Sequence, residues 1–95
     1  MNEYESVIII KPNLDEGEIE GIITEITDLI NQNGEVTKVE KMGVRKLAYE
    51  ISKCKEGYYI VIYFETKADV IVELERNYRI NENIIKFITV RNDEN

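Results

Sequence analysis

The chain has 95 residues and a formal net charge of −7, with 43% hydrophobic and 33% charged residues. This length and balance are typical of one folded domain and exclude a disordered chain. One cysteine and no histidine exclude an internal disulfide, the common zinc sites and histidine-dependent triads. No apolar run approaches the roughly 18 residues of a membrane helix, and no signal peptide is recognisable, so we expect a cytoplasmic protein without a membrane partner.

The charge is unevenly distributed along the chain. Residues 1–37 contain nine acids and one base, whereas residues 38–55 contain six bases and two acids. An acidic surface disfavours indiscriminate binding to nucleic acid. One basic segment within an acidic chain therefore indicates a directed contact.

The first expected element is a strand over residues 4–10, which stops before Pro12. A helix follows, and its start is predicted by a capping-box pattern of Asp15 with Glu18. Asn33-Gly34 is expected to close this helix, because glycine adopts the left-handed conformation without a steric cost. The apolar side chains of the helix recur at three- and four-residue spacing and are those of Ile19, Ile22, Ile23, Ile26, Leu29 and Ile30.

Residues 35–51 alternate between apolar and charged side chains and predict a long strand. Met42-Gly43 interrupts the alternation, which predicts a bend or bulge at the glycine. A polar turn is expected over residues 53–57, and the aromatic and β-branched residues 58–64 predict the next strand. These two strands should pair as a hairpin.

Thr66 to Asp69 has the N-cap residue and the third-position acid of a second helix, which should end near Arg79. A last strand is expected over residues 84–90. The resulting order βαββαβ predicts a single α+β domain over residues 1–95 with the ferredoxin-like arrangement, a four-stranded antiparallel sheet with two helices on one face. The residues expected to be buried between helices and sheet include Ile8, Ile23, Ile26, Leu74 and Ile88.

The sequence offers little catalytic chemistry. The acids near Asp15 are best explained as the solvated, dipole-complementing start of a helix. The loop after the first strand contains Pro12, two acids and no arginine, which argues against an acylphosphatase-type anion site. Cys54 lies between two lysines but has no second cysteine for redox chemistry. We therefore expect no enzyme activity, no metal, no cofactor and no small-molecule substrate.

The basic segment is interleaved with tyrosines, a combination that suits RNA through phosphate pairing and ring stacking. A solvated strand face explains the same residues, and the pattern alone does not decide between the two interpretations. Residues 57–63 match the aromatic third-strand motif of the RNA-recognition fold only in part, because Tyr59 and Ile60 stand at two of its key positions.

Several blocks of the chain carry a family resemblance: Tyr4-Glu5 with residues 12–14 (PNL), residues 43–51 (GVRKLAYEI), Lys53 with residues 57–59 (GYY), and residues 78–84 (YRINENI). In their order and spacing they resemble the family of the sixth protein of the bacterial small ribosomal subunit. The segment GVRKLAYEI is the most specific of these blocks.

This resemblance implies a ferredoxin-like fold, no catalysis, and a place on the ribosome. It further implies pairing with the eighteenth small-subunit protein and binding of that pair to the central domain of the small-subunit ribosomal RNA. The residues then expected to contact RNA or partner are Tyr4, Arg45, Lys46, Tyr49, Lys53, Tyr59, Arg79, Lys86 and Arg91. Two alternatives stay open, a small-molecule regulatory module of the same fold and a binder of single-stranded RNA that acts alone.

Overall fold

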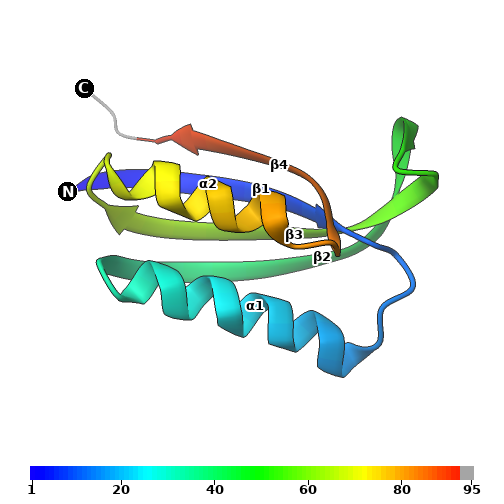
Figure 1. Ribbon diagram of the computed structural model, residues 1–95, viewed down its shortest axis with the longest axis horizontal. Coiled ribbons are helices and arrows are strands. Elements are labelled where there is room, and N and C mark those ends of the chain that lie inside the picture. The colour runs from blue at the N-terminus through cyan, green and yellow to red at the C-terminus, as the bar shows by residue number, and fades with distance from the viewer. Residues whose placement is uncertain (93–95) are drawn as a thin grey trace.

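The structure is a computed structural model that describes residues 1–92. Its elements follow in the order β1 (Asn2–Ile10), α1 (Glu16–Asn31), β2 (Gly34–Ile51), β3 (Cys54–Thr66), α2 (Val70–Ile80) and β4 (Ile84–Arg91). The strands form one antiparallel sheet in the order β2-β3-β1-β4. Both helices lie on the same face of this sheet (Figure 1), which confirms the predicted ferredoxin-like arrangement and leaves the other face, here called the open face, without a helix.

The core lies between the helices and the sheet. Ile8, Ile23, Ile26 and Leu74 are buried there as predicted, but Ile88 is 55% exposed, so that prediction was wrong. The register explains the error, because it places Phe87 opposite Ile8 and hence toward the helices. Successive strand residues point to opposite faces, so Ile88 points to the open face.

The start and end of α1 follow different rules. The capping box is present as predicted: the Glu18 amide donates to Asp15 Oδ1 at 2.8 Å, and the Asp15 amide donates to Glu18 Oε1 at 3.0 Å. At the other end the role predicted for Gly34 was wrong, since its backbone is not left-handed. A Cβ there would lie 2.2 Å from the carbonyl oxygen of Glu65. Gly34 is needed for the close approach of β2 to β3.

The start of α2 also differs from the prediction. Thr66 is the last residue of β3, and its buried hydroxyl donates to the carbonyl of Asn33 at 3.1 Å. The N-cap is Asp69, whose side chain makes no capping hydrogen bond. The helix ends at Ile80, one residue beyond the expected end. Pairing of β3 along its full length therefore takes precedence over the local capping pattern.

The β2–β3 hairpin contains the predicted bend. Gly43 has φ of 85°, and the pairing register shifts between Lys41 and Gly43. The turn is shorter than expected, since Ser52 and Lys53 have φ of 50° and 66° and β3 already begins at Cys54. Positive φ at both central residues defines the tight hairpin turn whose twist matches that of the strands. The hairpin extends well past the end of β1 (Figure 1).

Candidate functional site

The open face is formed by alternate residues of the strands. The pairing registers align these residues in rows across the sheet, so that Lys86, Ile9 and Tyr59 are neighbours. The face comprises Glu3, Glu5, Val7 and Ile9 of β1, Tyr59, Val61, Tyr63 and Glu65 of β3, Lys86, Ile88 and Val90 of β4, and Glu35, Lys38, Glu40 and Arg45 of β2.

Charge on the open face changes along the strand direction. At one end Glu3 lies opposite Glu65, with Glu5 one row away. At the other end, toward the hairpin, lie Lys86 and Arg45. Phosphate is attracted to the second end and repelled from the first.

The middle of the open face presents apolar side chains to solvent. Ile88 is 55% exposed and Val90 42% exposed, and Val7, opposite Ile88, is half-buried. We call these three residues the apolar stripe. They lie on the edge strand β4 and its neighbour β1. Adjoining exposed apolar side chains of this kind favour contact with another protein rather than with phosphate.

The end of the hairpin reaches β4, although β3 and β1 separate β2 from β4 within the sheet. The ammonium of Lys86 donates to the Tyr49 hydroxyl at 3.0 Å and lies 5.3 Å from the centroid of that ring. This hydrogen bond raises the pKa of Lys86 and lowers the pKa of Tyr49. Both groups are exposed, so the contact positions the hairpin end beside β4 more than it stabilises the fold.

Two bases of the predicted basic segment are already paired with acids. Lys38 lies 3.2 Å from the Glu40 carboxylate, which also accepts from Tyr63 at 3.1 Å. The hydrogen bond from Lys38, followed by that from Tyr63, lowers the pKa of Glu40. Lys41 pairs with Glu20 of α1 on the helix-covered side. Within residues 1–92 no ion pair is formed by the other four bases of the segment, Arg45, Lys46, Lys53 and Lys55.

A hollow of about 720 Å³ lies where the hairpin passes the loop after β1. It brings together Lys46 and Lys53, two of the predicted site residues, and adds Lys55. Pro12, Asn13, Cys54 and Glu56 complete its lining. Three lysines around one open hollow favour contact with a polyanion such as an RNA backbone. We call Arg45, Lys86 and these three lysines the basic hairpin end.

The remaining residues of the predicted site lie on the helix-covered side. Tyr4 is only 7% exposed, and its ring lies 5.7 Å from that of Phe64 in the core. Arg91 is placed opposite Tyr4 by the register, and the Arg79 guanidinium lies 5.6 Å from the centroid of the Phe87 ring. A buried ring cannot stack on a base, so Tyr4 acts in the core and is left out of the interface proposed below.

Tyr59 and Tyr63, the rings on the open face, are both half-buried. The glycine that begins their strand segment has a packing role, because a Cβ at Gly57 would lie 2.3 Å from Cγ2 of Ile9. Stacking of single-stranded RNA needs well-exposed rings. The open face therefore favours a shared protein and RNA interface over an independent single-strand binder.

Sequence reasoning missed the apolar stripe. Residues 84–90 are apolar at nearly every position, so their alternation does not identify the buried face. Only the pairing of Ile88 with Val7 shows which side chains point away from the helices. Pairing partners so far apart in the sequence leave no local pattern.

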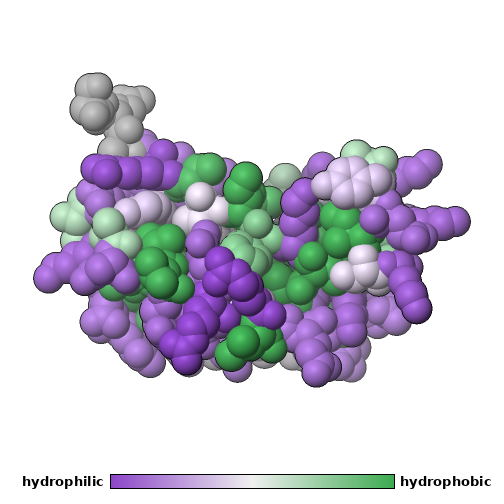
Figure 2. Space-filling model, turned by 45° about the horizontal axis from the view of Figure 1, so that its top comes forward, coloured by the Kyte–Doolittle hydropathy of each residue, from purple (hydrophilic) through white to green (hydrophobic). Residues whose placement is uncertain are grey.

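The surface seen in Figure 2 is mainly hydrophilic, with hydrophobic areas interspersed among the polar side chains. No group of three or more potential metal ligands occurs among residues 1–92. Over the same range neither helix is long and apolar enough to cross a membrane.

The model of the family described as ribosomal protein S6 matches residues 3–91. The small ribosomal subunit protein bS6 of Heliobacterium modesticaldum is 44% identical over 95 residues, which is 99% of this chain and 99% of that protein. The bS6 protein of Helicobacter hepaticus is 49% identical over 92 residues, covering 96% of this chain and 67% of that protein.

The same likeness holds in three dimensions. The crystal structure of ribosomal protein S6 from Thermotoga maritima matches with a TM-score of 0.90 and 43% sequence identity, covering 96% of this chain and 87% of that chain. Sequence and fold therefore agree over nearly the whole length.

Proposed function

The chain belongs to the ribosomal protein S6 family, and from this premise we propose that it binds the central domain of small-subunit ribosomal RNA together with the eighteenth small-subunit protein. Members of the family are structural components of the small ribosomal subunit and not enzymes. The proposal concerns the contacts that hold this component in place.

One observation carries the proposal: the apolar stripe on the open face lies beside the basic hairpin end, which begins on that face at Arg45 and Lys86 and continues to the lysine-lined hollow. The stripe, Val7, Ile88 and Val90, offers apolar area to a protein. The hairpin end offers Arg45, Lys86 and the lysine-lined hollow to phosphate. Two adjacent surfaces of different chemistry suit two partners that contact each other as well as this chain.

Arg45 is the basic residue best suited to the shared boundary. It is exposed, lies opposite Gly57 on the open face, and forms no ion pair within the described residues. Its planar guanidinium can make paired hydrogen bonds with phosphate or carboxylate and is less strongly hydrated than an ammonium group. Lys46, Tyr49, Lys53, Tyr59 and Lys86 accompany it, whereas Arg79 and Arg91 are candidates for RNA that passes along the helix-covered side.

The stripe can be tested with two matched substitutions that add the same charge. Ile88→Glu places a carboxylate on the open face, whereas Val72→Glu places one on α2, where Val72 is 73% exposed. We expect Ile88→Glu to weaken heterodimer formation with the eighteenth small-subunit protein by at least about tenfold, because the buried carboxylate has no partner. Val72→Glu should bind like the wild type. Equal affinities for the two variants in a calorimetric titration would remove the stripe from the interface.

A further inference from the structure

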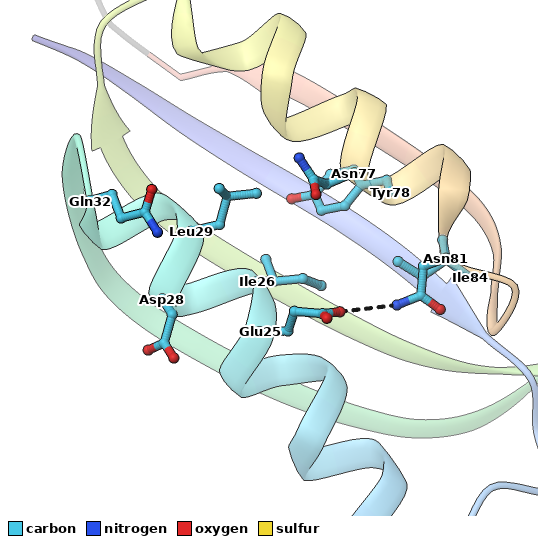
Figure 3. A pocket seen from close by; sticks show the side chains of 9 residues that line it. All are labelled: Glu25, Ile26, Asp28, Leu29, Gln32, Asn77, Tyr78, Asn81 and Ile84. Atoms are coloured by element: carbon cyan, nitrogen blue, oxygen red, sulfur yellow. Dashed lines mark hydrogen bonds between the residues drawn. The ribbon is translucent and has the colours of Figure 1, made fainter.

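The two helices form a second surface feature, a groove on the helix-covered side of the sheet, away from the open face. It has a volume of about 260 Å³ and lies between α1 and α2 (Figure 3). Its floor is apolar and consists of Ile26, Leu29, Tyr78 and Ile84. Its rim is polar and consists of Glu25, Asp28, Gln32, Asn77 and Asn81. The volume is below the range of roughly 300–1,000 Å³ of pockets for drug-sized ligands, which favours the side chain of a larger partner.

The rim of the groove is electronegative. Glu25 and Asp28 carry carboxylates that form no ion pair within residues 1–92. Gln32 and Asn81, the C-cap residues of α1 and α2, lie at opposite ends of the groove (Figure 3) and add side-chain amide oxygens to its rim. The two carboxylates therefore favour a cation over an anion at the rim.

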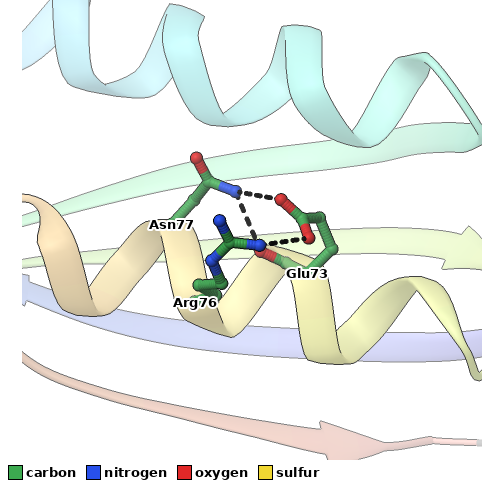
Figure 4. A network of polar contacts seen from close by, with 3 residues as sticks. All are labelled: Glu73, Arg76 and Asn77. Carbon is green, nitrogen blue, oxygen red and sulfur yellow. Dashed lines mark hydrogen bonds and ion pairs between the residues drawn. The ribbon is translucent and has the colours of Figure 1, made fainter.

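Among residues 1–92 no positively charged side chain lines the groove. Arg76, next to Asn77 on α2, lies 3.1 Å from the Glu73 carboxylate of the same helix, and Asn77 donates to the Glu73 carbonyl oxygen at 2.9 Å (Figure 4). Arg79 is directed to the Phe87 ring on the other side of α2. The negative charge of the groove is therefore left for an external group.

Glu25 is positioned to receive such a group. Within the described part of the chain its carboxylate accepts one long hydrogen bond, of 3.4 Å, from Asn81 across the groove (Figure 3). A guanidinium can replace this weak contact with a charge-assisted pair of hydrogen bonds. Its aliphatic stem meanwhile covers the apolar floor, as long basic side chains do elsewhere.

We propose that the groove between α1 and α2 binds an arginine side chain of a basic protein segment. Arginine fits better than lysine because its fork can bond the Glu25 carboxylate and the neighbouring amide oxygens together. The site is independent of the open face and does not require the function proposed above.

The test is a titration of the isotopically labelled 95-residue chain with a short blocked peptide that contains one arginine, followed by amide NMR. We expect saturable shifts confined to residues 25–32 and 77–84, including the side-chain amides of Gln32, Asn77 and Asn81. A peptide with citrulline in place of arginine keeps the shape but lacks the charge, and it should bind about tenfold more weakly.

Two variants that remove the same charge complete the test. Glu25→Gln should weaken arginine-peptide binding by about tenfold, whereas Glu50→Gln, at the exposed hairpin end, should not. Equal binding by the two variants, equal binding of the citrulline peptide, or shifts spread over all acidic surfaces would overturn the proposal. Because neither RNA nor the eighteenth small-subunit protein is present, this result does not depend on the proposed function.

Discussion

Arg45 is expected to contribute to binding and not to the stability of the fold. Since its side chain is exposed and forms no ion pair among the described residues, Arg45→Ala should change the free energy of unfolding by no more than about 0.5 kcal/mol. The same substitution should reduce heterodimer formation or RNA affinity. Loss of a phosphate contact should reduce the slope of log RNA affinity against log salt concentration by about one. Titrations at several salt concentrations measure both effects.

Arg76→Ala is the matched control for this prediction. Arg76 is also exposed, but it lies on α2 and pairs with Glu73, away from the open face. It removes the same charge from the chain. If Arg45→Ala assembles like Arg76→Ala, or loses assembly only because it unfolds, Arg45 does not belong to the interface.

Tyr78 gives the fold a pH dependence that can be isolated. Its hydroxyl is buried and donates to Ser6 Oγ at 3.0 Å, and Ser6 Oγ lies 2.8 Å from Thr89 Oγ1. Burial raises the pKa of Tyr78. A raised pKa in the folded state stabilises the protein fully below the unfolded value of roughly 10 and progressively less above it. The unfolding free energy should therefore fall as pH rises above about 10.

Tyr78→Phe removes this contribution and leaves the other tyrosines in place. At neutral pH it should cost about 1 kcal/mol through the lost hydrogen bond. Above about pH 10 its unfolding free energy should fall less steeply than that of the wild type. Parallel curves for the two proteins in denaturant titrations across this range would show that Tyr78 ionisation is not coupled to unfolding.

At the scale of elements, two glycines have opposite roles. Gly21 lies exposed within α1, and Gly43 has φ of 85° at the bend of β2; a Cβ at either position meets nothing within 4 Å. Sterically the two sites are equal, so only backbone conformation distinguishes them. Gly21→Ala should stabilise the chain by about 0.5–1 kcal/mol, and Gly43→Ala should destabilise it by about 1–2 kcal/mol. Thermal unfolding measures both, and a change of the same sign in the two variants would contradict the assigned conformations.

The elements that could be predicted are those whose signals are local. The capping box at Asp15, the isoleucine stripe of α1 and the bend at Gly43 each depend on residues close in sequence, and each is confirmed. The start of α2 could not be read in this way. Thr66 is a residue type that commonly caps helices, but its pairing with Gly34 keeps it in the sheet. A long-range ladder outweighs a local preference here.

The candidate site shows the same division. The basic segment was visible in the composition, whereas the open face depends on strand register. Register brings Lys86 beside Ile9 and turns Ile88 outward, and the burial of Tyr4 follows from its place opposite Phe64. A shift of one residue reverses the face of every side chain in a strand, so these positions required the structure.

For the whole molecule, the negative net charge is expected to limit its affinity for RNA. Residues 38–55 carry a net charge of +4, and the rest of the chain carries −11. Lys38 and Lys41 are further neutralised by Glu40 and Glu20. The basic hairpin end is thus small and is opposed by the overall charge, so isolated binding to RNA should be weak at physiological salt. We expect a partner that covers the apolar stripe and adds its own contacts to strengthen the binding through coupling.

The most direct test of the proposed cooperative binding measures the affinity for a central-domain fragment of small-subunit ribosomal RNA at fixed physiological salt. It compares the chain alone, the eighteenth small-subunit protein alone, and the two together. We expect the pair to bind at least about tenfold more tightly than either protein, which corresponds to a coupling of about 1.4 kcal/mol or more. Binding by the chain alone that is as tight as binding by the pair would contradict the account.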